Sequence, residues 1–171
     1  SIYRASKQAS EIIIEAFSEQ HKLNYTFLRY GSLYGPRAQD WNGLRNRVET
    51  IINKKKLTYY GTGMEEREYI HIKDAANMSV KALSENYINQ AVTLTGSQVI
   101  NSKALIEMIF EIANIKPNID FKNPDKTNIK HYIKTPYRYT PKQSKKISPN
   151  EYIDFGQGLL EVIEEAYKTN N

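Results

Sequence analysis

Tyr25-Thr-Phe-Leu-Arg-Tyr30 combines β-branched and aromatic side chains, which is typical of a buried β-strand. Gly31, Gly35 and Pro36 follow it, so we expect the strand to end in a loop. Before the strand, apolar residues recur at the spacing of one helix face. They predict an amphipathic helix over residues 3 to 20 through Ala9, Ile12, Ile13, Ala16 and Phe17.

The alternation of helix and strand continues towards the C-terminus. Further helices are predicted by apolar periodicity at 44–52, from about 74, at 102–112 and at 156–168, and further strands at 57–60, 67–72 and 91–95. Such alternation predicts an α/β domain that contains a parallel sheet. Residues 122–150 are rich in Lys, Pro and Tyr, and we expect them to be irregular. In the helix starting near Asp74, the residues expected to face inward are Ala76, Val80, Leu83 and Tyr87.

Composition restricts the classes of function. The 171 residues are 40% hydrophobic, and no apolar run exceeds three residues, so neither a membrane span nor a secretory segment is expected. The absence of cysteine excludes disulfides and thiolate sites and is compatible with a cytoplasmic location. A net charge of +5 suits an anionic ligand without indicating nucleic acid.

Several common sites are missing from the sequence. The three histidines, His21, His71 and His131, show no metal-binding spacing, so no metal is predicted. Gly61-Thr-Gly63 and Gly156-Gln-Gly158 lack the third glycine of a dinucleotide-binding turn, and no GxSxG motif is present. The chain therefore carries no phosphate-binding glycine turn of its own.

Tyr3 and Lys7 are the informative pair, because residues four apart share one face of a helix. A phenol with a pKa near ~10 is a poor base at neutral pH, and each unit of depression represents about 1.4 kcal/mol. A lysine one turn away supplies a field that favours the phenolate. Such a pair also occurs on ordinary solvated helices, so the spacing alone leaves both interpretations open.

Three motifs occur in a fixed order: Tyr3-Arg-Ala-Ser-Lys7, Leu28-Arg-Tyr-Gly-Ser-Leu-Tyr-Gly-Pro-Arg37 and Arg67-Glu-Tyr-Ile-His-Ile-Lys-Asp74. They resemble YxxxK, LRYxNVYGPR and RDFIHVDD of the extended short-chain dehydrogenases/reductases, specifically the nucleotide-sugar epimerases and dehydratases. The resemblance implies the C-terminal part of a Rossmann-like doubly wound parallel sheet plus the small substrate-binding domain. It corresponds to about the C-terminal half of such an enzyme.

The N-terminal cofactor-binding half, with its glycine-rich turn, is then expected to lie upstream of residue 1. We therefore expect residues 1–171 to be a single fragment that does not turn over alone. Loss of half of a doubly wound sheet should leave apolar surface and an unpaired strand edge exposed, so that the fragment associates or rearranges.

The resemblance also implies roles for individual residues. Tyr3 accepts the proton of a sugar hydroxyl as hydride leaves the same carbon for NAD or NADP, and Lys7 lowers the phenol pKa and binds the nicotinamide ribose. Tyr30 and Gly31 match positions beside the nicotinamide, and glycine lets the backbone approach closely.

Substrate contacts follow from the same motifs. Ser32 replaces the family's usual asparagine, which puts the usual sugar or phosphate contact in doubt. Arg67 resembles the residue that grips the diphosphate, with a salt bridge to Glu65 or Glu66 as the alternative. Further candidates for contacts with a nucleotide diphosphate sugar are Tyr137, Arg138 and Lys142.

Three other motif residues are expected to be structural. Arg37 is interpreted as a solvated loop residue, His71 as a core residue and Asp74 as a helix cap.

The reaction is either epimerisation, by an isomerase, or dehydration, by a lyase. The resemblance implies a homodimer through the YxxxK helix, with Ile14 on the associating face. The alternative is a non-enzymatic module that binds a polyanion through residues 122–146 or that serves dimerisation. The modest charge and the lack of an RNA-binding signature disfavour nucleic acid.

Overall fold

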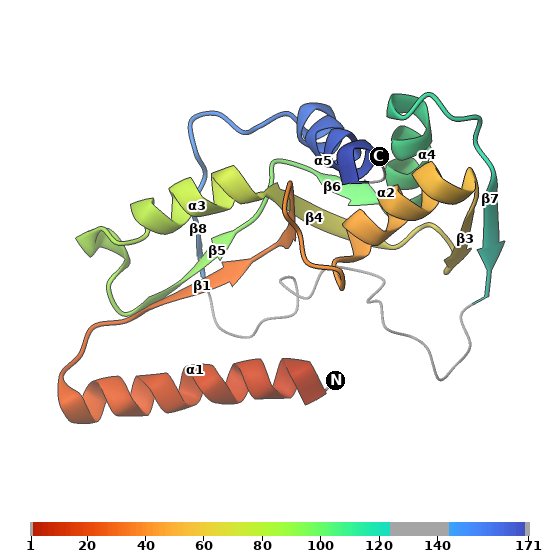
Figure 1. The fold of residues 1–171 in the computed structure, drawn as a ribbon. Coiled ribbons are helices and arrows are strands. Elements are labelled where there is room, and N and C mark those ends of the chain that lie inside the picture. Colours follow the sequence, from red (N-terminus) through yellow and green to blue (C-terminus); the bar gives the residue numbers. More distant parts are fainter. Residues whose placement is uncertain (1, 124–143, 170–171) are drawn as a thin grey trace.

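The structure is a computed structural model that describes residues 2–123 and 144–169. Helices and short strands alternate along the chain (Figure 1). The helical elements are α1 (Ile2–His21), α2 (Gly43–Lys54), α3 (Ile72–Lys81), η1 (Glu85–Tyr87), α4 (Ser102–Ile112) and α5 (Phe155–Thr169). The strands are β1 (Thr26–Tyr30), β2 (Ser32–Tyr34), β3 (Leu57–Tyr60), β4 (Glu66–His71), β5 (Gln90–Leu94), β6 (Val99–Asn101), β7 (Ile119–Lys122) and β8 (Lys145–Lys146).

The described strands form three small sheets, in which most pairs are parallel. β1, β5 and β8 form one parallel sheet in that order, and Tyr30 lies opposite Leu94. β2 pairs in parallel with β4, which pairs antiparallel with β6, and β3 pairs in parallel with β7. The predicted α/β class with parallel pairing is therefore confirmed. β1 stands at the end of its sheet, which leaves one of its edges without a partner among the described strands.

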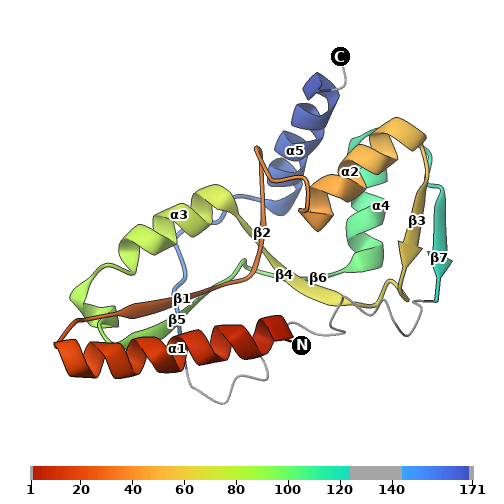
Figure 2. The ribbon, with the colours of Figure 1, turned by 60° about the horizontal axis from the view of Figure 1, so that its bottom comes forward.

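Two hydrophobic clusters hold the fold together. In the larger one, α2, α4 and α5 pack together (Figure 2), and its fully buried side chains include Val48, Ile51, Leu105 and Leu159. The smaller cluster joins α3 to β4 and β5 through Met78, Ile70, Val92 and Leu94. Each of these four helices, α2 to α5, therefore buries an apolar stripe against its own neighbours.

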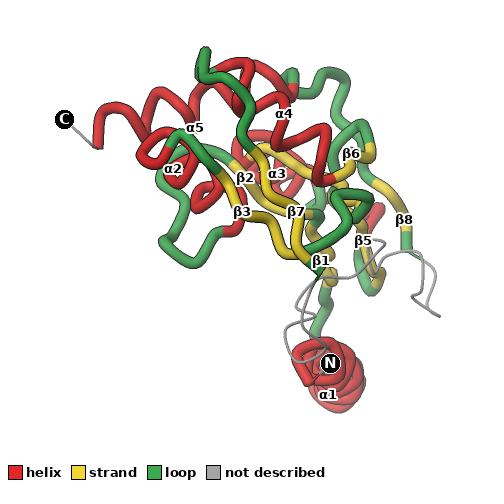
Figure 3. The backbone as a smooth tube through the Cα atoms, turned by 90° about the vertical axis from the view of Figure 1, so that its right-hand side faces the viewer, coloured by secondary structure: helices red, strands yellow, loops and turns green. Residues whose placement is uncertain are grey.

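Helix α1 forms where the sequence predicts it, but its apolar face is not covered. None of its residues, all of which the structure describes, is buried, and Ile12, Ile13 and Phe17 are more than half exposed. The helix lies apart from the rest of the described fold (Figures 1 and 3). Helix α1 therefore leaves an apolar face exposed, and β1 has an open edge among the described strands.

The predicted inward face of the third helix is wrong. Val80 and Leu83 are exposed, and the residues that pack inward are Ala75, Met78 and Ala82. The helix begins at Ile72 rather than near Asp74, and the His71 side chain caps it by accepting a hydrogen bond from the Lys73 N–H. Asp74 is buried inside the helix and accepts a hydrogen bond from the Ile153 N–H, so its expected role as the cap is also wrong.

Four short strands were not predicted. β2 lies within the expected loop after Gly31, β6 precedes α4, β7 follows α4, and β8 lies inside the segment expected to be irregular. Each has only two to four residues, too few to show a clear period-2 pattern. Within the described ranges, no helix has the length and apolar character needed to cross a membrane.

Candidate active-site groove

A groove of about 1280 Å³ separates α1 from β1, β2 and the start of α2. It brings together residues that are up to 66 positions apart in the sequence, from Tyr3 to Tyr69. One wall is the face of α1 that carries residues 3, 7, 11 and 14. Six of the predicted site residues line it: Tyr3, Lys7, Tyr30, Gly31, Ser32 and Arg67. The other three, Tyr137, Arg138 and Lys142, lie outside the described residues.

Tyr3 and Lys7 lie one helical turn apart on this wall. The Lys7 ammonium is 5.4 Å from the centroid of the Tyr3 ring, within the range of a cation–π contact. The Tyr3 side chain remains 69% exposed. The phenol and the ammonium are therefore adjacent and accessible to a ligand in the groove.

An ion pair fastens α1 to the opposite wall. Arg29 of β1 donates two hydrogen bonds to Glu11, from Nε to Oε1 at 2.8 Å and from Nη2 to Oε2 at 2.6 Å. Its hydrogen bonds with Glu11 raise the pKa of Arg29, so the guanidinium stays charged. Glu11 lies one helical turn after Lys7. The Arg29–Glu11 ion pair therefore sets the distance between the α1 residues Tyr3 and Lys7 and strand β1.

Tyr30 and Gly31 form the floor of the groove at the end of β1. The Tyr30 hydroxyl shares a hydrogen bond of 2.6 Å with the Ser79 hydroxyl on α3. A Cβ on Gly31 would lie 2.7 Å from the Glu68 carbonyl oxygen of β4, so the fold itself requires glycine here. This close approach within the chain was not predicted, and it explains Gly31 without any ligand.

Ser32 and Arg67 come from neighbouring strands of the second sheet. Ser32 pairs with Tyr69, two residues beyond Arg67 on β4, so the parallel register brings both to the groove. Arg67 Nη1 donates to the Glu66 carbonyl oxygen at 2.7 Å. This contact ties the guanidinium to the backbone of the preceding residue.

The Glu65 carboxylate, which the sequence offers as an alternative partner of Arg67, accepts hydrogen bonds from the turn that precedes it. It accepts hydrogen bonds from the N–H groups of Thr62 and Gly63 at 2.8 and 3.0 Å and from the Tyr59 hydroxyl at 3.0 Å. Burial acts to raise the pKa of Glu65, but the hydrogen bonds from Thr62, from the Glu65 backbone and from Tyr59 together outweigh it, and the pKa stays below its usual value.

Several lining residues were missed by sequence reasoning, among them Trp41, Asn42, Arg47 and Tyr69. Trp41 is the one tryptophan of the sequence and is 83% exposed at the groove, which no periodicity reveals. Asn42 caps α2 by accepting from the N–H groups of Leu44 and Arg45. The cap fixes the start of α2 at the rim of the groove.

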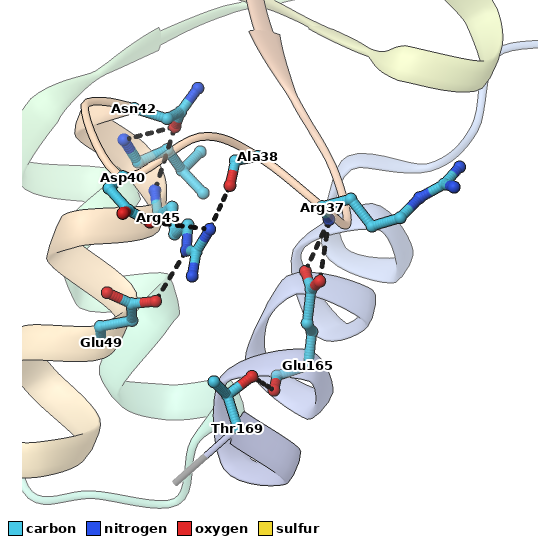
Figure 4. A network of polar contacts seen from close by, with 9 residues as sticks. Arg37, Ala38, Asp40, Asn42, Arg45, Glu49, Glu165 and Thr169 are labelled. Carbon is cyan, nitrogen blue, oxygen red and sulfur yellow. Dashed lines mark hydrogen bonds and ion pairs between the residues drawn. The ribbon is translucent and has the colours of Figure 1, made fainter.

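Arg37 does not belong to the described groove lining, in agreement with its interpretation as a solvated residue. Its backbone N–H donates to both carboxylate oxygens of Glu165 on α5, at 2.9 and 2.8 Å, and its side chain points away from that contact (Figure 4). Nearby, Arg45 pairs with Glu49 and Asp40 and donates to the Ala38 carbonyl (Figure 4). These contacts hold the turn between β2 and α2.

His71 lies outside the groove and is a buried residue of the fold, as expected from the sequence. Its Nε2 is 3.5 Å from Glu161 Oε2 on α5, and its ring packs edge-on against Tyr34. Burial lowers the pKa of His71, with Lys73 acting in the same direction and Glu161 and Asp74 opposing it.

Because the folded state binds a proton at His71 less readily than the unfolded state, stability should decrease as pH falls below about 6.5. We expect the free energy of unfolding, measured by urea titration at several pH values, to fall between neutral pH and pH 5. His71→Gln should flatten this dependence, whereas His21→Gln, on exposed α1, should leave it unchanged. An unaltered slope in the His71 variant would assign the pH dependence to other groups.

Comparison with known proteins gives the family. The model of the NAD dependent epimerase/dehydratase family matches residues 1–93. An uncharacterised protein of Schizosaccharomyces pombe is 28% identical over 92% of the chain and 42% of its own length. The UDP-glucuronate 4-epimerase of Thermodesulfobacterium geofontis is 24% identical over 76% of the chain and 40% of its length.

The fold is shared with solved structures. The crystal structure of UDP-glucuronic acid 4-epimerase from Bacillus cereus, in complex with UDP-glucuronic acid and NAD, matches 99% of the chain with a TM-score of 0.81 at 19% identity. The chain covers 53% of that protein, and it spans about half or less of the length of the relatives it matches. From the family match over residues 1–93, the chain belongs to the NAD dependent epimerase/dehydratase family.

Proposed function

We propose that the chain carries the catalytic Tyr/Lys pair and the substrate-binding residues of an NAD-dependent nucleotide-sugar epimerase or dehydratase. The observation that carries the proposal is the groove, where Tyr3 and Lys7 on α1 are opposite Arg67 on β4. Family membership supports the same reaction class, because its members named above act on nucleotide sugars.

Tyr3 acts as the base in this proposal. Its phenolate oxygen takes the proton of a sugar hydroxyl as hydride leaves the same carbon, and it returns the proton when the resulting carbonyl is reduced or the product is released. The Lys7 ammonium, adjacent to the ring, stabilises the phenolate and binds the nicotinamide ribose. NAD, when bound, supplies the acceptor for the hydride.

The residues present fit only one end of this cofactor. An exposed phenol and an ammonium, beside the backbone of Tyr30 and Gly31, suit the nicotinamide and its ribose. Residues 1–171 include no glycine-rich turn for the pyrophosphate, so we assign that group to no residue here. We accordingly propose that these residues alone do not turn over.

Substrate binding is proposed for Arg67, whose guanidinium matches phosphate oxygens, and for Ser32, whose hydroxyl replaces a longer amide. We further propose that the smaller hydrophobic cluster belongs to the Rossmann-like part and the larger one to the substrate-binding part, a division supported by their separation. The contacts expected from Tyr137, Arg138 and Lys142, and the cytoplasmic location, stay predictions.

The experiment is an assay of the polypeptide expressed from the full reading frame that encodes these residues. It is incubated with NAD and, separately, UDP-glucose, UDP-glucuronate and dTDP-glucose, and the products are followed by NMR. Inversion at a sugar carbon would identify an epimerase, and loss of water would identify a dehydratase. Neither product with any substrate, together with no binding of these sugars, would refute the proposed function.

We also propose a homodimer through α1, because the helix presents apolar residues on the side away from the groove. Ile13 and Phe17, one turn apart, are 65% and 53% exposed, and neither lines the groove. Ile14, which we expected on this face, lines the groove instead. The associating face is therefore centred on Ile13 rather than Ile14.

Ile13→Glu should shift the protein from dimer to monomer, because a charge would be buried without a partner at the interface. Sedimentation velocity across a concentration series measures this shift. Leu83→Glu, at a residue that is 82% exposed after α3, is the matched control and should not change the oligomeric state. A wild type that stays monomeric at all concentrations would contradict the proposed interface.

A further inference from the structure

The groove is strongly cationic. Five basic side chains line it, and the one acid among its described lining residues, Glu11, is already bound to Arg29. The basic residues are Arg4, Lys7, Arg29, Arg47 and Arg67. This imbalance favours an anionic ligand with more than one negative group.

Arg47 differs from the arginine two residues before it on α2. Arg45 is paired with Glu49 at 2.7 Å and Asp40 at 3.3 Å, and it does not line the groove. Arg47 lines the groove, and no carboxylate of the described residues forms an ion pair with it. Its charge is therefore available to a ligand.

Aromatic contacts hold the Arg47 side chain in place. Its guanidinium carbon lies 5.4 Å from the centroid of the Tyr59 ring, and Nη1 lies 3.4 Å from the Tyr69 hydroxyl oxygen. Stacking and one long hydrogen bond leave further N–H donors of the planar guanidinium unused. The head group is thus oriented before any ligand binds.

Tyr69 connects Arg47 to Arg67. Residues two apart on a strand point to the same face, so Arg67 and Tyr69 project from the same face of β4. Arg47 contacts the Tyr69 hydroxyl from α2. Arg47, Tyr69 and Arg67 therefore line the same groove, with the Tyr69 hydroxyl in contact with Arg47.

We infer that Arg47 is a second diphosphate-binding residue, which holds one phosphate of a nucleoside diphosphate group while Arg67 holds the other. This inference rests on the proposed function, since it assigns a further residue to the same substrate. It also predicts a specificity: the groove should prefer nucleoside diphosphates to monophosphates, because a single phosphate can engage only one of the two guanidinium groups well.

Isothermal titration calorimetry of the chain tests this inference, with UDP, dTDP and GDP and the matching monophosphates as probes. Arg47→Gln should weaken binding of the tightest-binding diphosphate by between about ten- and a hundredfold. The same substitution should weaken binding of the matching monophosphate by much less. Lys54→Gln removes a charge from the exposed end of α2 and should leave both affinities unchanged. It controls for general electrostatic attraction.

Since Arg47 stacks on Tyr59, thermal unfolding is measured for each variant. Arg47→Lys keeps the charge but loses the planar guanidinium with its paired N–H donors. This variant should also lose most of the preference for diphosphates. Unchanged diphosphate affinity in the folded variants, or no binding of any diphosphate by the wild type, would overturn the inference. The binding result does not depend on turnover, so it is separable from failure of the epimerase or dehydratase assay.

Discussion

Tyr3→Phe should reduce turnover by about a thousandfold, because it removes only the hydroxyl proposed to take the proton from the sugar. The ring remains, so its contact with Lys7 and the conformation of α1 should be retained. The affinity for the nucleotide sugar should not change, since the proposed diphosphate-binding residues are unaltered. A fall in kcat with a constant KM, measured on the polypeptide from the full reading frame, is the expected signature.

Tyr60→Phe is the matched control for this variant. Tyr60 is also largely exposed, at 61%, but it lies outside the groove. Its loss of a hydroxyl should leave kcat and KM within about twofold of wild type. Retained turnover in Tyr3→Phe would refute the assignment of Tyr3 as the base, even if the family reaction itself is observed.

Gly96→Ala should produce the largest loss of stability among the glycine substitutions. A Cβ at this position would lie 1.8 Å from the Tyr69 carbonyl oxygen, which belongs to backbone that is fixed in β4. Either the loop after β5 or β4 must move, and we expect a destabilisation of about 3 kcal/mol or more, if the variant folds at all. Urea unfolding followed by circular dichroism measures the change.

Gly43→Ala is the control for this substitution. Gly43 opens α2, and a Cβ there meets no atom within 4 Å. Alanine should be neutral or should stabilise the chain by up to about 1 kcal/mol, because it restricts the unfolded chain and favours the helix. Equal stability of the two variants would mean that the loop after β5 does not approach the backbone of β4 as closely as the 1.8 Å distance at Gly96 implies.

Elements with a long and regular pattern were predictable from the sequence. The periodicity of Leu44, Val48 and Ile51 identified α2, and all three are buried as expected. The same kind of pattern misled the prediction for α3. The pattern places the start of α3 near Asp74, whereas the helix cap is His71. The pattern also places Val80 and Leu83 on the inward face, whereas both side chains are exposed to solvent.

The residues of the candidate site also differ in whether the sequence predicts them. Tyr3, Lys7 and Arg67 could be selected because they lie in motifs that resemble those of a family. Arg47 and Trp41 could not, because nothing in their local sequence separates them from other surface residues. Arg47 differs from Arg45 in lining the groove and in having no acidic partner among the described residues. That difference depends on how α2 packs against β3 and β4.

Because α1 buries none of its side chains and is fastened to β1 by Arg29 and Glu11, it has little packing to oppose local opening. The two residues proposed to do the chemistry therefore lie on a low-stability element of the fold. Any molecule that bridges α1 and the opposite wall must pay the conformational entropy of ordering the helix. Whichever molecule binds first lowers that cost for the next, so positive cooperativity between the proposed cofactor and substrate is the expected consequence.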